Sequence, residues 1–171
     1  MRLAFATVIS KVPFPGIVVL LAAAQTFPDA PQGPIQPLPF SHKTHVSSGL
    51  ACQDCHATAD RGEAAGFPAL SKCMACHTAV AKDRPSIVKL AELYKKQEPI
   101  PWKRVYRVPD YVAFSHKTHV GTAHVACGTC HGSVQDRDVI RKEKPTSMAA
   151  CVDCHKQNGA SVACDYCHEP R

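Results

Sequence analysis

The sequence is poor in the features that usually build a globular interior or a nucleic-acid surface. Only 6% of its 171 residues are aromatic, with a single tryptophan among them, while proline occurs 14 times. A core made of side chains alone would therefore be thin for this length. The formal charge of +6 is spread along the chain, and no basic stripe indicates nucleic-acid binding. The chain also lacks an uninterrupted apolar run of about 20 residues, the length that a membrane-spanning helix needs.

The most apolar stretch lies near the N-terminus, where PGIVVLLAAA occupies residues 15–24. A positive start at Arg2, a short apolar run and small residues at its end are typical of a secretory signal. We therefore predict a signal peptide over 1–24 with cleavage near Gln25; an uncleaved N-terminal membrane anchor is the alternative. In both cases the rest of the chain is expected to be periplasmic or exported, in the second case held at the outer face of the cytoplasmic membrane. Membrane contact is expected only through this N-terminal segment.

The remaining chain divides into a linker and two related modules. Five prolines between residues 25 and 39 favour an extended linker. The words Phe-Ser-His-Lys-Thr-His then occur twice, at 40–45 and again 74 positions later at 114–119. We predict a first module over 40–99 and a second module over 100–171.

One segment has a clear helical period. In PSIVKLAELYKKQ, residues 85–97, apolar side chains recur at helical spacing. Proline suits the first turn of a helix, and Lys95 and Lys96 suit its C-terminal end. The following Glu-Pro-Ile-Pro is expected to end the helix, and residues 102–111 are predicted as an extended connector.

All ten cysteines fall into five Cys-x-x-Cys pairs, and a histidine directly follows each pair. This grouping is typical of covalent haem c, in which two thiols bond the porphyrin vinyl groups and the adjacent imidazole binds the iron. A disulfide framework and zinc sites, whose two-pair spacing is matched by gaps of 17 and 20 residues, are the alternatives. Neither requires a histidine after every pair, so we predict five haem c groups. The attachment residues are Cys52, Cys55, Cys73, Cys76, Cys127, Cys130, Cys151, Cys154, Cys164 and Cys167, with His56, His77, His131, His155 and His168 as proximal iron ligands.

Five further histidines match the five remaining axial positions in number. Four of them belong to the repeated element, where residues three apart lie on neighbouring sides of a helical turn, so that each pair can serve two haems. The fifth has no counterpart in the first copy, and Met148 is its rival, because Met74 is confined within an attachment loop. The first member of each pair is expected at the haem that follows it. The predicted distal ligands are His42, His45, His116, His119 and His124.

At these residues the chain resembles the class III multihaem cytochromes c, whose signature is Phe-x-His-x-x-His upstream of Cys-x-x-Cys-His. The 2 + 3 arrangement of attachment sites, PWKRV at 101–105, VPDYV at 108–112 and Met148 before the fourth site are similar to the pentahaem cytochrome subunit of alternative complex III. That resemblance implies a place in a quinol-oxidising membrane assembly that passes electrons to periplasmic carriers. It also implies that the paired histidines ligate two different haems.

With two protein ligands on every iron, no iron has an open position for a substrate, which argues for electron transfer and against catalysis. We predict a non-enzymatic electron-transfer protein that serves redox partner proteins, free or in a membrane quinol-oxidising complex. The predicted fold is mainly irregular with short α-helices, organised around five haems, with little or no β-sheet. Only eight residues separate His155 from Cys164, so the last two haems are expected to be neighbours. A small-molecule reductase, with the haem assigned to His124 left open, is the alternative.

Overall fold

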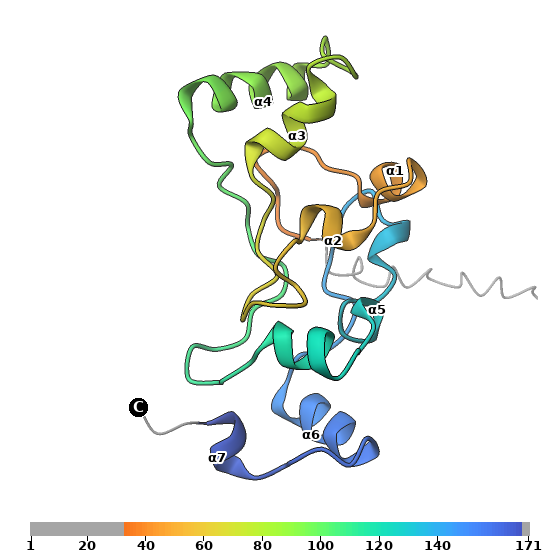
Figure 1. Cartoon of the computed structure of the whole chain (residues 1–171), viewed down its shortest axis with the longest axis vertical. Helices are drawn as coiled ribbons and strands as arrows, with labels where there is room; N and C mark the ends of the chain where they lie inside the picture. Colours follow the sequence, from red (N-terminus) through yellow and green to blue (C-terminus); the bar gives the residue numbers. More distant parts are fainter. Residues whose placement is uncertain (1–32, 169–171) are drawn as a thin grey trace, which may run out of the picture.

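The computed structural model describes residues 33–168 as short helices joined by irregular segments (Figure 1). No strand occurs in that range, which confirms the predicted fold class. The signal peptide or anchor predicted for 1–24 lies outside the described residues, as does the first part of the predicted linker. Between residues 33 and 168, no helix is both long and apolar enough to cross a membrane.

Most helical elements are one or two turns long. In Figure 1, α3 and α4 lie at one end of the elongated molecule and α6 and α7 at the other, with α2 and α5 between them. In chain order the elements are α1 (His42–Ser47), α2 (Cys52–Cys55), α3 (Leu70–His77), α4 (Pro85–Lys96), the π-helix η1 (Lys117–Thr122), α5 (Cys127–His131), the 3₁₀ turn η2 (Val134–Asp136), α6 (Met148–Gln157) and α7 (Cys164–Cys167).

The helix predicted from periodicity is confirmed as α4, the longest of these elements. Pro85 occupies its first turn, where a missing N–H costs no hydrogen bond. Gln97 ends the helix in the left-handed conformation with φ of 59°, and the N–H of Glu98 then donates to Leu93 O at 3.0 Å. The connector over 102–111 contains no strand.

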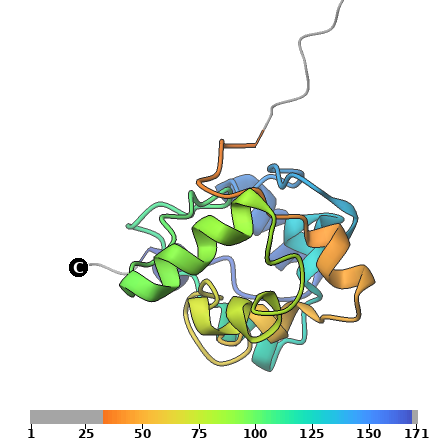
Figure 2. The ribbon, with the colours of Figure 1, turned by 90° about the horizontal axis from the view of Figure 1, so that it is seen from above.

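The apolar core is small and sits at the α3–α4 end. Leu38, Met74 and Leu90 form a buried cluster against which α4 packs on α3, and Figure 2 shows the two helices side by side from above. Within the described range the only other buried apolar residue is Ala59. This confirms that side chains alone provide a thin core. Met74 of this cluster lies between Cys73 and Cys76 in α3.

The two copies of the repeated element fold differently although the repeated words are identical. The first copy forms the α-helix α1 and the second the π-helix η1. From Phe to the first cysteine the second copy is one residue longer, and a π turn takes one residue more than an α turn. The N–H of Ala123 accordingly donates to Thr118 O, five residues back, at 2.9 Å. The π-helix ends at Thr122 with Ala123 as its cap, and His124 follows with φ of 53°.

The two predicted modules hold each other's repeated element. The loop after the first cysteine pair binds the start of η1 by two hydrogen bonds. The N–H groups of His116 and Lys117 donate to Glu63 O and Gly62 O at 3.1 and 2.9 Å. The corresponding loop after Cys127–His131 binds α1. There the N–H of Lys43 donates to Arg137 O at 3.0 Å. These reciprocal contacts hold the two modules together.

Candidate functional site

The five Cys-x-x-Cys-His segments are numbered here along the chain: site 1 (52–56), site 2 (73–77), site 3 (127–131), site 4 (151–155) and site 5 (164–168). Each cysteine pair lies within a single helix, α2, α3, α5, α6 and α7 respectively. Residues three apart on a helix are surface neighbours, so the two thiols of a pair share one side. At sites 1 and 5 the N–H of the following histidine closes the turn on the first cysteine's carbonyl at 2.9 Å.

The cysteines do not form the alternative sites that the sequence leaves open. All ten thiols lie in the described range and none is in a disulfide. No three or more His, Cys, Asp or Glu side chains between residues 33 and 168 are grouped to hold a metal ion. Neither the disulfide framework nor the zinc module therefore gains support from this geometry.

Four of the five proximal histidines are held by the same kind of hydrogen bond. Their Nδ1 atoms face backbone carbonyl oxygens, which only accept hydrogen bonds, so Nδ1 carries the proton. The other ring nitrogen, Nε2, is then unprotonated and available to a metal, as in most metal-ligating histidines. The acceptors are Gly66 O for His56 (2.8 Å), Val80 O for His77 (2.9 Å), Ser161 O for His155 (2.6 Å) and Tyr111 O for His168 (3.3 Å).

Three of the histidines from the repeated element are oriented in the same way. His45 donates from Nδ1 to Ser41 O at 2.7 Å, and His119 makes the equivalent bond to Ser115 O at 2.8 Å. His116 donates across the module boundary to Glu63 O at 3.0 Å. These backbone contacts fix the tautomer that leaves Nε2 free for iron.

The phenylalanine of the repeated element sets the angle between its two histidines. Phe114 stacks on His119 (4.6 Å between centroids, 23° between planes) and meets His116 edge-on (5.0 Å, 87°). Phe40 repeats the arrangement, stacked on His45 at 4.3 Å and edge-on to His42 at 4.9 Å. One ring thus holds two imidazoles roughly perpendicular, and they face different neighbours.

Three distal histidines face a proximal histidine across a gap of nearly constant width. Two metal–nitrogen bonds of about 2 Å each, plus the offset of each nitrogen from its ring centre, would place the two centroids about 6 Å apart. The structure matches this spacing, so the residues fit an iron between them. The pairs are His45 with His77 at site 2 (6.2 Å), His116 with His131 at site 3 (6.3 Å) and His119 with His155 at site 4 (6.1 Å).

His42 lies next to site 1. Burial is the main cause that lowers its pKa, and the nearby His56 imidazole lowers it further. Its Nδ1 atom is buried and has no hydrogen-bond partner among the described residues. No hydrogen bond therefore fixes the tautomer of His42, and its placement at site 1 rests on its position beside His56.

His124 lies away from the fifth site. It lines a shallow hollow between α2 and α5, next to one cysteine of site 1 and one of site 3. No contact within residues 33–168 joins its ring to His168. Of the five distal ligands predicted from the sequence, His124 is therefore the one that does not lie beside a proximal histidine of its own site. The hollow is lined by Ala51, Cys52, Gln53, Val120, Val125, Ala126 and Cys127 together with His124.

Neighbouring thiols reveal the spatial order of the sites. In four pairs of cysteines from different sites, burial is the main cause that raises the pKa of one thiol, and the partner thiol raises it further. These electrostatic interactions place site 2 near site 1, site 1 near site 3, site 3 near site 4, and site 4 near site 5. The same order runs down the molecule as α3, α2, α5, α6 and α7 (Figure 1). The pairs are Cys73 with Cys55, Cys127 with Cys52, Cys130 with Cys154, and Cys151 with Cys167.

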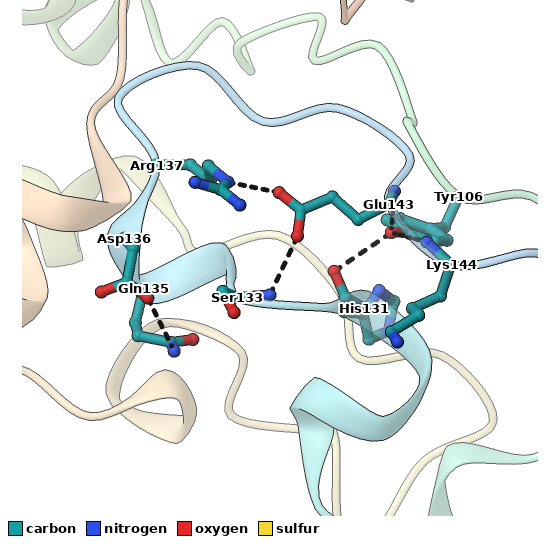
Figure 3. Close-up of polar contacts among 8 residues, drawn as sticks. All are labelled: Tyr106, His131, Ser133, Gln135, Asp136, Arg137, Glu143 and Lys144. Atoms are coloured by element: carbon teal, nitrogen blue, oxygen red, sulfur yellow. Dashed lines mark hydrogen bonds and ion pairs between the residues drawn. The ribbon is translucent and has the colours of Figure 1, made fainter. Parts of the chain in front are cut away.

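A polar cluster braces site 3 (Figure 3). The Tyr106 hydroxyl donates to His131 O at 3.1 Å and accepts from the N–H of Glu143 at 2.8 Å. The Glu143 carboxylate accepts from the N–H of Ser133 at 3.0 Å and from the Arg137 guanidinium. The Tyr106 ring also meets His131 edge-on at 4.5 Å. The cluster fixes the loop between sites 3 and 4 and the ring of His131.

Sequence reasoning did not assign a role to these bracing residues. Tyr106, Arg137 and Glu143 each occur in contexts without a counterpart in the first module, so no repeat marked them. Phe40 and Phe114 were part of the repeated words, and their recurrence was a signal that could have revealed a positioning role.

Comparisons with known proteins match most of the described chain. A family described as cytochrome c7 and related cytochrome c matches twice, over residues 38–97 and 112–169. The multihaem cytochrome c subunit of menaquinone reductase from Nitratidesulfovibrio vulgaris (strain Hildenborough) is 29% identical, over 78% of this chain and 77% of that protein. The high-molecular-weight cytochrome c of the same organism is 27% identical over 72% of this chain, which spans only 27% of that protein's length.

Proposed function

Because the chain belongs to the family of cytochrome c7 and related cytochromes c, we propose that it carries five haem c groups, one per attachment site, and passes electrons along them between redox partners. Membership confirms the resemblance to multihaem cytochromes c: the chain is a multihaem c-type cytochrome that transfers electrons and binds haem covalently. Haem supplies the one-electron chemistry when bound. The chain supplies attachment, axial ligands and the spacing between sites.

The observation that carries the proposal is the facing of imidazoles across gaps of 6.1 to 6.3 Å at sites 2, 3 and 4. Both rings of a pair can bind one iron, which leaves no position there for a substrate. We assign His45, His116 and His119 to these three sites and His42 to site 1. All ten cysteines serve as covalent attachment points, and the histidine after each pair is the proximal ligand.

The order of the sites supports a single line of electron transfer with sites 2 and 5 at its ends. The repeated elements link sites 2 and 1 through α1, and sites 3 and 4 through η1. The contact between Cys52 and Cys127 joins the two halves. The double family match supports a division into modules over 40–99 and 100–171. Iron positions from anomalous scattering test the line directly, and a branched arrangement of the five irons would contradict it.

We place the protein in the periplasm or at the outer face of the cytoplasmic membrane, either cleaved from its N-terminal segment or anchored by it. The relative that is a subunit of menaquinone reductase supports a partnership with a membrane complex that reacts with quinone. The sequence resemblance implies quinol oxidation, whereas the relative's name specifies quinone reduction. The direction depends on the difference in reduction potential between partners.

The decisive experiment measures haem and iron ligation together. The purified protein is expected to show a haem c spectrum, about five haems per chain by pyridine haemochrome, and a low-spin oxidised form. Replacing Cys164 and Cys167 by serine removes one attachment site and is expected to lower the count by one. A protein that contains zinc and no haem would contradict the proposal.

The proposed partnership is tested in membranes. With the protein in its native membranes, addition of menaquinol or of an external electron donor should change the haem spectrum through an inhibitor-sensitive quinone reaction. Membranes that lack the protein serve as the control. Haem that never exchanges electrons with the quinone pool in either direction would confine the proposal to a free carrier.

A further inference from the structure

The assignments above leave the sixth ligand of site 5 open. His42, His45, His116 and His119 are each placed at another site, and α7 presents only His168 as a proximal ligand. The segment before the second repeated element makes two hydrogen bonds to site 5: the His168 ring donates from Nδ1 to Tyr111 O, and the N–H of Ala113 donates to Cys167 O at 2.8 Å. Because Nδ1 of His168 is occupied, an iron at site 5 would bind Nε2. The sixth ligand would then lie on the far side of that iron.

His124 is poorly placed for this role. It borders the hollow between sites 1 and 3, together with Cys52 and Cys127. In the order of the sites, site 4 separates site 3 from site 5. His124 therefore lies between sites 1 and 3 and does not border site 5. It follows the cap of the π-helix, with φ of 53°. The extra residue of the second copy accounts for this position without an iron.

Met148 is better placed. It is the first residue of α6, and Cys151 follows one turn later on the same side of the helix. Cys151 in turn lies near enough to Cys167 of site 5 for the two thiols to interact electrostatically, so the first turn of α6 lies toward site 5. Figure 1 shows α6 and α7 next to each other at this end of the molecule.

The side chain of Met148 is also accessible as a ligand. It is 70% exposed, so it is not held inside an apolar core. Ser147 caps α6, its hydroxyl accepting from the N–H of Ala150 at 3.3 Å, so the start of the helix is fixed. Met74, the other methionine of the described range, is 8% exposed in the α3–α4 core and cannot reach site 5.

We propose that Met148, and not His124, is the sixth ligand at site 5, so that the last site of the line combines His168 with a thioether while the other four combine two imidazoles. This inference rests on the proposed function, since it presupposes a haem at site 5. Replacing an imidazole by methionine raises the reduction potential of a haem. Site 5 is then the most oxidising of the five and the end of the line at which electrons collect.

The first test needs no variant. Proton NMR of the fully reduced protein should show one methyl resonance shifted strongly upfield by the haem ring current, the mark of an axial methionine. The oxidised protein should show the red methionine–iron charge-transfer band, and the reduced protein should bind no carbon monoxide. Absence of the shifted methyl resonance would overturn the proposal.

Variants identify the residue. Met148→Leu should abolish the shifted resonance and the red band and let about one haem per chain bind carbon monoxide, while Met148→His should restore a closed low-spin site without the band. His124→Ala is the matched control and should leave all three signals unchanged. A carbon monoxide site created by His124→Ala, or one already present in the wild type, would overturn the proposal.

The haem count separates this inference from the function on which it rests. If every variant retains about five haems per chain but the methionine signals are absent, only the assignment of Met148 fails. If the wild type itself carries no haem, the proposed function fails.

Discussion

The imidazole planes of His116 and His131 lie within 6° of parallel, with centroids 6.3 Å apart. The first ring precedes the π-helix η1 and is held by Glu63 of the other module, and the second ends α5. Burial is the main cause that lowers the pKa of His131, and His116 lowers it further. Two partly buried imidazoles that face each other at this distance fit as ligands of one metal ion.

The two histidines of each repeated element should act on different irons. His116 faces site 3 and His119 faces site 4. We expect His116→Ala and His119→Ala each to convert about one haem per chain to the high-spin form, and the double variant to convert about two. Electron paramagnetic resonance of the oxidised protein measures the high-spin fraction.

Lys117→Ala is the control for this pair, because Lys117 lies between the two histidines and is exposed. It should give no high-spin signal. If the double variant shows no more high-spin haem than either single variant, the two histidines do not serve separate irons.

Phe114 should behave as a positioning residue for both of these histidines. It stacks on His119 and meets His116 edge-on, and aromatic pairs of this kind contribute about 0.5–1.5 kcal/mol each beyond the area they bury. We expect Phe114→Ala to lower the melting temperature and to broaden the low-spin resonances of two haems, because the imidazole orientations are no longer fixed.

Phe40→Ala is the matched variant in the first copy and should broaden the resonances of the haems at sites 1 and 2 instead. Loss of stability with sharp, unchanged resonances in both variants would mean that the rings only fill space.

Gly121 should tolerate no side chain, because the π-helix packs directly on the first module. A Cβ at Gly121 would lie 2.0 Å from Asp60 O, and backbone atoms cannot move aside as the end of a side chain can. Overpacking of this kind costs about 1–3 kcal/mol, so Gly121→Ala should lower the free energy of unfolding and disturb the haems at sites 3 and 4. Chemical denaturation followed at the haem absorbance measures both effects.

Gly128→Ala provides the control, because a Cβ there would meet nothing within 4 Å. If Gly121→Ala lowers the free energy of unfolding no more than Gly128→Ala does, the steric argument is wrong.

The haem sites and the π-helix mark what the sequence can and cannot predict. Covalent attachment requires two cysteines and a histidine close together in sequence, so the five sites can be recognised as Cys-x-x-Cys-His motifs. That His45 faces His77 depends on how α1 and α3 are placed relative to each other, and no local sequence pattern encodes this placement. The repeat pointed to its histidines as ligands but did not show that the second copy would accommodate its extra residue as a π turn.

The bracing of site 3 was invisible for a similar reason. Tyr106 lies 25 residues from His131 in sequence, and Glu143 reaches back over a loop to Ser133. Each contact depends on the path of an irregular segment, which has no period from which to predict it. The thin core, by contrast, follows from composition, because few large apolar side chains are available to fill it.

The ion pair of Glu143 with Arg137 should make stability depend on pH in the acid range. The hydrogen bond from Arg137 is the main cause that lowers the pKa of Glu143, and the bond from the Ser133 N–H adds to it. A carboxyl group whose folded pKa lies below its unfolded value of about 4.3 contributes stability that is complete above that value. This contribution is lost as pH falls through the folded pKa.

Glu143→Gln keeps the shape and a hydrogen-bond acceptor but removes the charge. The melting temperature of the wild type should therefore exceed that of Glu143→Gln at neutral pH, and the difference should shrink as the pH falls below about 4. Asp153→Asn, the same change on an exposed position of α6, should leave the melting temperature nearly unchanged at neutral pH. A difference between wild type and Glu143→Gln that stays constant down to the lowest pH would assign the lost stability to packing, because only an ionised carboxylate can give a contribution that protonation removes.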